Sequence, residues 1–115
     1  MKFGKLKRSW QFARIYKEGG RYSNDLFILY ILPNGTQETR LGLTVTKKIG
    51  ISVQRNRIKR LIREVLRSLN EIATGSDLVV VAKKATFELT YLQAYNSLKE
   101  LLTRARLLKY ITNKA

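Results

Sequence analysis

Apolar residues in the first quarter of the chain recur with the period of a helix. Phe12, Ile15 and Tyr16 fall on one helical face. Ser9 is the predicted N-cap, and Gly19-Gly20 is the predicted end of this helix. The next pattern has the length and composition of a strand: residues 26–32 read LFILYIL, and the turn signal of residues 33–35 follows them.

Further strands and a helix follow. Leu41, Leu43 and Val45 alternate with small or polar residues, which predicts a strand with one buried face. An earlier strand at residues 21–23 is only weakly indicated. A continuous helical stripe comes next, and its members are Ile58, Leu61, Ile62, Val65, Leu69 and Ile72.

The last third of the chain predicts a helix break, a buried strand and a final helix. Thr74-Gly75-Ser76 ends the preceding helix, and residues 78–82 form an uninterrupted apolar run. Thr90 and Gln93 have the spacing of a capping box. The apolar face expected for the final helix consists of Tyr91, Tyr95, Leu98, Leu102 and Ala105. The order α-β-β-β-α-β-α predicts an α+β fold, an α/β sandwich in which helices pack on a small mixed sheet.

The length of 115 residues suits one domain, so we expect a single domain over residues 1–115. The charge makes a polyanion the leading partner, because 23 Lys and Arg stand against 8 Asp and Glu, for a net charge of +15. Charge alone also admits an acidic membrane surface or an acidic protein.

The sequence contains neither cysteine nor histidine. Disulfides, zinc sites built on Cys or His, and Ser-His-Asp or Cys-His catalysis are therefore excluded. The longest apolar run is far shorter than the ~20 residues of a membrane span, and the first residues lack a signal-peptide pattern, so a cytoplasmic protein is expected. The carboxylates are scattered without metal-ligand spacing, and no phosphate-binding glycine loop is present. Catalysis by this chain alone is not expected.

The segment of residues 47–67 carries the strongest functional signal. On a helix, Arg55, Lys59, Arg63 and Arg67 stack four residues apart, and like charges at that spacing destabilise an isolated helix by up to ~0.5 kcal/mol per pair. A bound phosphate backbone would convert this repulsion into attraction. The alternative is a solvated, arginine-rich face without a ligand.

Aromatic residues form the second signal. Phe12, Tyr16, Phe27 and Tyr30 lie in the first helix and the strand expected to pack near it. Unpaired bases stack on such rings, each worth roughly 1–3 kcal/mol. Their spacing alone favours the alternative, in which the rings belong to the core.

The run KKIGISVQRNRIKRLIRE, residues 47–64, closely resembles the signature of the protein subunit of bacterial ribonuclease P, with Ser52 where the family usually has Ala. The opening LKRSWQFARIYKEG, the strands FILYIL and RLGLTVTKK, and the strand SDLVVVAKKA extend the resemblance over nearly the whole chain. It implies a left-handed β-α-β crossover, against the usual handedness.

The resemblance also implies a function. The protein would be an accessory subunit of an endoribonuclease that acts in tRNA processing and removes the 5′ leader of precursor tRNA. The partner RNA and its Mg²⁺ would perform the hydrolysis, and the protein would bind no cofactor or metal. The partners would be one catalytic RNA per protein and the leader, without a membrane, and the protein alone would be a monomer.

Site residues follow from the resemblance position by position. It assigns contact with the catalytic RNA to the basic helix, namely Arg55, Asn56, Arg57, Lys59, Arg60 and Arg63, and the ridge adds Arg67. It assigns contact with the leader to Phe12, Tyr16, Tyr30, Lys47, Lys48 and Lys83. Two other classes use a similar basic surface: a helix-turn-helix protein on DNA, which the flanking strands disfavour, and a ribosomal protein.

Overall fold

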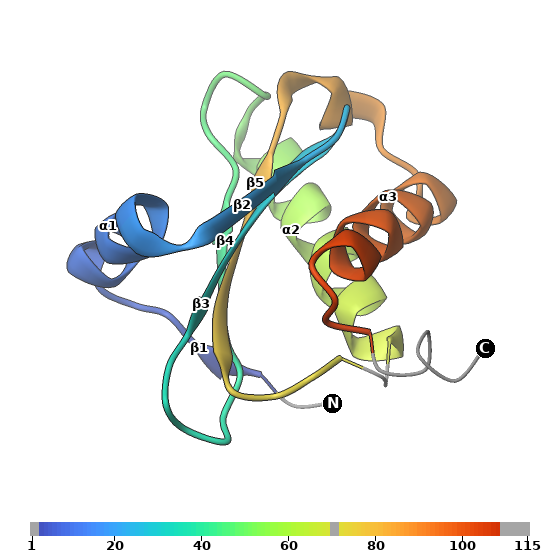
Figure 1. The fold of residues 1–115 in the computed structure, drawn as a ribbon. Helices are drawn as coiled ribbons and strands as arrows, with labels where there is room; N and C mark the ends of the chain where they lie inside the picture. Colours follow the sequence, from blue (N-terminus) through green and yellow to red (C-terminus); the bar gives the residue numbers. More distant parts are fainter. Residues whose placement is uncertain (1–2, 70–71, 109–115) are drawn as a thin grey trace, which may run out of the picture.

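The computed structural model describes residues 3–69 and 72–108 and is built on a five-stranded mixed sheet in the order β1-β4-β5-β3-β2. The strands are β1 (Gly4–Lys5), β2 (Gly20–Ser23), β3 (Phe27–Pro33), β4 (Arg40–Thr44) and β5 (Ser76–Ala82). The helices are α1 (Ser9–Glu18), α2 (Ser52–Ser68) and α3 (Tyr91–Arg104), with a short 3₁₀ helix η1 (Lys84–Glu88) before α3 (Figure 1). The predicted α+β class and the α-β-β-β-α-β-α order are confirmed, with β1 added in front.

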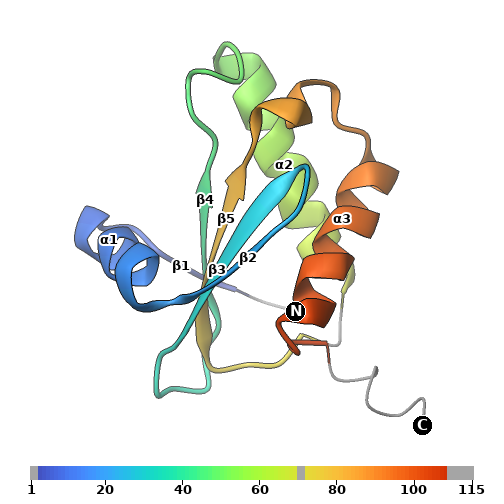
Figure 2. The ribbon, with the colours of Figure 1, turned by 45° about the horizontal axis from the view of Figure 1, so that its top comes forward.

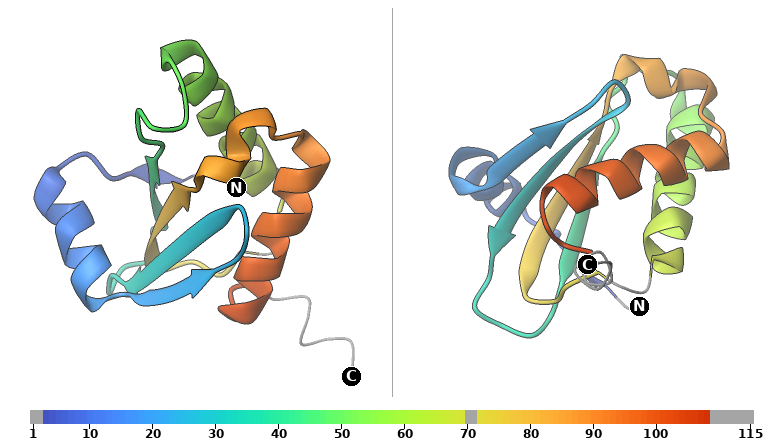
Figure 3. Two further views of the ribbon diagram at one scale, coloured as in Figure 1. Left: turned by 90° about the horizontal axis from the view of Figure 1, so that it is seen from above. Right: turned by 45° about the vertical axis from the view of Figure 1, so that its right-hand side comes forward.

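Both strand directions occur in the sheet. β2, β3 and β5 pair antiparallel, whereas β1 and β5 each run parallel to β4. The connection between the adjacent parallel strands β4 and β5 passes through α2. α1 lies on one side of the sheet, and α2 and α3 lie on the other (Figures 2 and 3).

The alternation of β5 divides the apolar residues between these two sides. Leu78 and Val80 are buried in the large core that α2 and α3 cover, together with Phe27 and Ile62. Val79 points to the other side, where it joins Leu6 and Ile15 in a small cluster under α1. The continuous apolar run of residues 78–82 is therefore explained by a central strand that is covered on both faces.

The third residue of each α-helix is a glutamine. The side-chain oxygens of Gln11, Gln54 and Gln93 accept hydrogen bonds from the amides of Arg8, Ile51 and Thr90, each at 3.0 Å. The predicted Thr90–Gln93 capping box is confirmed, since the amide of Gln93 also donates to the Thr90 hydroxyl at 3.2 Å. The prediction of Ser9 as N-cap is wrong by one residue, because Arg8 occupies the cap. The Gln11 side chain, which accepts from the Arg8 amide, stabilises that start without a hydroxyl cap.

Two further helix predictions are corrected. α2 ends at Ser68, so Ile72 does not continue its stripe; instead Ile72 is buried in an isolated bridge to Leu108. Tyr91 lies on the exposed side of α3, whose buried residues are Ala94, Leu98, Leu101 and Leu102. Aliphatic side chains fill the space against α2, and the Tyr91 hydroxyl instead donates to Ser68 at 3.2 Å.

Candidate nucleic-acid interface

The basic residues of α2 form one arc on the helix surface. Residues four apart lie one above the other, so Lys59, Arg63 and Arg67 follow one another along the helix, with Asn56 and Arg60 beside them. The buried side of α2 is the opposite one, formed by Ile58, Ile62, Val65 and Leu66. Among residues 3–69 and 72–108, the ion pairs are Arg14–Glu18 and Arg40–Asp77, and neither involves α2. The predicted ridge is therefore a surface of cations without acidic partners in the described part of the chain.

Two arginines at the ends of this arc also bind the protein itself. Arg55 donates to the carbonyl of Gly50 and to the hydroxyl of Ser52, both at 3.2 Å, which holds its guanidinium at the start of α2. Arg57, on the other flank, donates to the carbonyl of Leu89 in front of α3. Arg57 therefore has a structural bond that its predicted RNA-binding role did not include.

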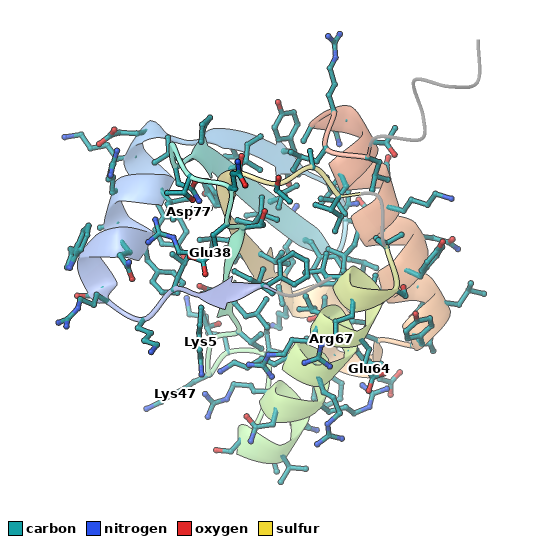
Figure 4. The ribbon with its side chains drawn as sticks, turned by 90° about the horizontal axis from the view of Figure 1, so that it is seen from below. Lys5, Glu38, Lys47, Glu64, Arg67 and Asp77 are labelled. Atoms are coloured by element: carbon teal, nitrogen blue, oxygen red, sulfur yellow. The ribbon has the colours of Figure 1, made fainter. Side chains whose placement is uncertain are left out.

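A groove lies between α2 and the outer edge of the sheet. Its volume is about 650 Å³, and it is bounded by Lys59, Arg63 and Arg67 on the helix side and by Phe3, Lys5 and Phe12 on the other. The backbone of β4 also lines it, at Leu41, Gly42 and Leu43. Figure 4 looks onto this side, with Lys5 and Arg67 labelled. The groove brings one of the predicted aromatic residues next to three of the predicted basic ones.

The three aromatic residues assigned to the leader form one cluster between α1 and the sheet. The rings of Tyr16 and Tyr30 meet edge to face at 4.9 Å between centroids, and Phe12 and Tyr16 are 6.4 Å apart. Tyr16 is 39% exposed, and its hydroxyl is 2.8 Å from the hydroxyl of Thr44 on β4. Phe27, the fourth predicted aromatic, is fully buried on the other side of the sheet. Phe27 therefore belongs to the core, Phe12 and Tyr30 are partly buried against the small cluster under α1, and Tyr16 is exposed.

Gly42 makes room for this cluster. A Cβ atom placed on Gly42 would lie 2.5 Å from the ring of Phe12, which is closer than such atoms approach. The missing side chain lets the Phe12 ring rest directly on β4, between the aromatic cluster and the groove.

The three lysines assigned to the leader have different surroundings. Lys47 and Lys48 are exposed in the turn between β4 and α2, close in sequence to the start of the basic helix. Lys83 is half-buried, and its ammonium donates to the backbone carbonyl of Asn24. Lys47 and Lys48 are therefore open to a ligand, whereas the ammonium of Lys83 binds the backbone.

The strongest ion pair of the described residues lies away from the basic arc. Arg40 donates two hydrogen bonds to the buried carboxylate of Asp77, at 2.7 and 2.8 Å. These bonds raise the pKa of the Arg40 guanidinium above its ordinary value, and Asn34 donates to the same carboxylate at 2.9 Å. These bonds connect β4 and β5 with the β3–β4 turn, so the role of Arg40 and Asp77 is structural.

The described residues contain no group of three His, Cys, Asp or Glu side chains that could hold a metal ion. None of their helices has the length and apolar character required to cross a bilayer. The site residues predicted from the sequence did not include Lys5, which lines the groove, or Thr44, whose hydroxyl contacts that of Tyr16. Lys5 belongs to the two-residue strand β1, and only the sheet pairing of Gly4–Lys5 beside β4 places it at the groove.

Comparison with known proteins gives a consistent set of relatives. A family model described as Ribonuclease P matches residues 1–106. The chain is similar to the "Ribonuclease P protein component" of Clostridium kluyveri, with 42% identity over 91% of this chain and 96% of the relative. The corresponding protein of Halalkalibacterium halodurans is 38% identical over 91% of this chain and 90% of its own length.

Solved structures show the same likeness. The RNase P protein of Staphylococcus aureus superposes with a TM-score of 0.84 at 36% identity, over 94% of this chain and all of that one. The RNase P protein from Thermotoga maritima gives a TM-score of 0.80 at 32% identity, over 87% of this chain and 96% of that one. Sequence and fold agree over nearly the full length.

Proposed function

This chain belongs to the ribonuclease P protein family, and from that membership we propose that its basic helix binds the catalytic RNA while its aromatic cluster binds the 5′ leader of precursor tRNA. The protein is the accessory subunit of an endoribonuclease that processes the 5′ end of tRNA, and catalysis lies in the RNA. Family membership selects this function over the helix-turn-helix and ribosomal alternatives.

The observation that carries the proposal is the uninterrupted path from the basic arc to the aromatic cluster. Lys59, Arg63 and Arg67 of α2 line the same groove as Phe12, and Phe12 is 6.4 Å from Tyr16 in the cluster. Cations neutralise phosphates, and arginine adds bidentate hydrogen bonds to phosphate oxygens. RNA bound to α2 would therefore lie within reach of a single strand on the rings. The full set assigned to the catalytic RNA is Arg55, Asn56, Arg57, Lys59, Arg60, Arg63 and Arg67.

The leader is the single-stranded part of the substrate, and the cluster suits a single strand. Tyr16 and Tyr30 present partly exposed rings on which bases can stack without sequence preference. Phe12 continues this surface, and Lys47 and Lys48 supply exposed positive charge in the turn before α2. Lys83 completes the assigned set, although its ammonium would first have to leave the Asn24 carbonyl.

The rest of the assignment concerns the holoenzyme. We propose that Mg²⁺ binds to the RNA, because RNA phosphates are hard oxygen ligands of the kind Mg²⁺ prefers. One protein per catalytic RNA is proposed, the free protein is proposed to be a monomer, and the cytoplasm is the proposed compartment. The proposed domain is the whole of residues 1–115.

The experiment is reconstitution with the ribonuclease P RNA of the same organism and an assay on precursor tRNA. We expect specific 5′ cleavage with Mg²⁺ only when the RNA is present, together with stronger binding of leader-bearing than of leaderless substrate. A preparation of the protein that is treated with nuclease and repurified should not cleave. Cleavage by that preparation would contradict the division of labour, and equal binding of the two substrates would contradict the role of the cluster.

A further inference from the structure

The groove between α2 and the sheet edge has a shape and chemistry that a simple phosphate-binding face does not require. We propose that it holds one unstacked nucleotide of the catalytic RNA, with the phosphate on the α2 side and the base on the β4 side. The inference rests on the proposed function, in which α2 binds that RNA. It adds a defined pocket for a single nucleotide to what would otherwise be contact between a helix and a phosphate backbone.

One wall of the groove is cationic. Lys59, Arg63 and Arg67 approach it from α2, and Lys5 approaches it from β1. Among the described residues no carboxylate lines the groove or forms an ion pair with these four side chains. Four cations around one opening provide more positive charge than a neutral ligand requires, and they match a phosphate that is shared between neighbouring nucleotides.

The other wall is apolar. Phe3, Leu6 and Phe12 supply side chains, and Leu41 and Leu43 supply the floor. A phosphate alone gains nothing from such a surface, whereas the flat face of a base can pack on it. The volume of about 650 Å³ is within the range of pockets that hold small organic ligands. The cationic wall therefore matches the phosphate of a nucleotide, and the apolar wall matches its base.

The exposed edge of β4 offers hydrogen bonds to the base. β1 pairs only with Arg40 and Leu41, and the Leu41 carbonyl accepts from the amide of Leu6 at 3.1 Å. Two residues later the amide and carbonyl of Leu43 point to the same side of β4, where no described strand continues the pairing. A donor and an acceptor on one residue suit the edge of a base.

The occupant comes from the catalytic RNA rather than from the leader. The cations of the groove stand on α2, whereas Tyr16 and Tyr30, the central rings of the leader cluster, are not among the lining residues. Phe12 alone belongs to both surfaces. The groove therefore lies next to the two central rings of the leader cluster and shares only Phe12 with that cluster.

The first test measures ligand binding to the isolated chain by NMR, with adenosine 5′-monophosphate, inorganic phosphate, adenosine and hexaglutamate as probes. We expect the nucleotide to bind on the order of tenfold more tightly than phosphate, since one stacked base is worth about that factor, and more tightly than adenosine, which lacks the phosphate. The amide signals of Gly42 and Leu43 should shift. Equal binding of phosphate and nucleotide, or equal shifts with hexaglutamate, would overturn the proposal.

Variants locate the binding within the molecule. Arg63→Ala should weaken nucleotide binding severalfold, and Arg63→Lys should restore part of it because the charge returns. Arg21→Ala is the matched control: it removes the same side chain from an exposed position on β2, at the opposite edge of the sheet from the groove, and nucleotide binding should stay unchanged. Thermal unfolding of each variant verifies that the fold persists. Equal loss in Arg63→Ala and Arg21→Ala would mean that the nucleotide responds only to the overall positive charge, and it would overturn the pocket.

The second test uses the holoenzyme and exploits the absence of cysteine from the sequence. Lys5→Cys places one photo-crosslinking group at the groove, and Asn96→Cys, exposed on α3, is the control. We expect the group at residue 5 to crosslink to one or two adjacent unpaired nucleotides of the catalytic RNA, and the group at residue 96 to give no such product. Specific cleavage with crosslinks spread over paired RNA, or confined to the leader, would overturn this inference while leaving the proposed function intact. If the unmodified protein neither binds the catalytic RNA nor supports cleavage, the proposed function itself is contradicted.

Discussion

The two faces of the sheet are covered to very different extents. On one face α2 and α3 enclose a core that includes Phe27, Ile62 and Leu101, all with no exposed surface. On the other face α1 covers only a cluster around Leu6, Ile15 and Val79, and Tyr16 and Tyr30 at its border keep exposed surface. One face holds the protein together, and the other leaves aromatic surface available.

This difference teaches how a small protein can offer rings to a ligand without losing its fold. Apolar surface stabilises in proportion to the area removed from water, so the α2–α3 face supplies most of the burial. The rings on the α1 face can then remain partly open, because the larger core on the other face supplies most of the buried apolar surface. The basic arc of α2 lies outside both cores, and the groove beside β4 connects the surface of this arc with the α1 face of the sheet.

The largest expected effect comes from the well-covered face. Phe27→Ala should lower the free energy of unfolding by roughly 3–5 kcal/mol, the scale for removing a fully buried aromatic ring. Urea denaturation followed by circular dichroism measures this loss. Tyr30→Ala on the other face is the comparison and should cost clearly less. A similar loss in both variants would show that the two faces contribute equally, against the contrast drawn above.

A smaller effect separates two neighbouring arginines on α2. Arg57→Ala removes the hydrogen bond to the Leu89 carbonyl and should cost about 1 kcal/mol of stability. Arg60 forms no ion pair or side-chain hydrogen bond with the other described residues, so Arg60→Ala should cost almost nothing. Urea denaturation again provides the measurement.

In RNA binding, Arg60→Ala should reduce the slope of log K against log salt by about 0.7–0.9, the value for one lost phosphate contact. Filter binding over a series of salt concentrations measures the slope. An unchanged slope and affinity in Arg60→Ala would remove this residue from the RNA-binding surface.

The smallest expected effect concerns the edge of the aromatic cluster. Tyr16→Phe removes the hydrogen bond to Thr44 but keeps the ring, and the exposed position makes a loss of about 0.5 kcal/mol the expectation. Leader binding should change little because the stacking surface remains. Thermal unfolding and substrate binding of Tyr16→Phe and wild type, measured side by side, give the comparison. A large loss of leader affinity in this variant would mean that the hydroxyl, rather than the ring, contacts RNA.

Periodicity predicted the elements that follow a local rule. The arginine ridge of α2 follows from spacing along one helix, and the Thr90 cap follows from a motif of four residues. β1 could not be predicted in this way, because a strand of two residues exists only through its pairing with β4. Tyr91 was misplaced for a similar reason: a tyrosine fits an apolar stripe by spacing, and only the packing of α3 against α2 shows that it is exposed.

The candidate site likewise has one part that could be predicted from local sequence patterns and one part that could not. The individual basic residues could be identified from one segment, and the resemblance supplied the aromatic ones. The groove could not be predicted, since it requires β1, β4, α1 and α2 to meet and requires Gly42 to admit the ring of Phe12. The tie of Lys83 to Asn24 likewise joins residues 59 positions apart in the chain.

The most direct test of the account compares Tyr30→Ala with wild type on two substrates, precursor tRNA with its leader and mature tRNA without it. Binding to the reconstituted holoenzyme is measured for each pair, and unfolding of the free protein is measured in parallel. The account predicts that leader-bearing RNA loses ~1–3 kcal/mol of binding free energy, the value of one stacked base, while leaderless RNA loses almost none. Equal losses on both substrates, accompanied by a fall in stability as large as that of Phe27→Ala, would contradict it.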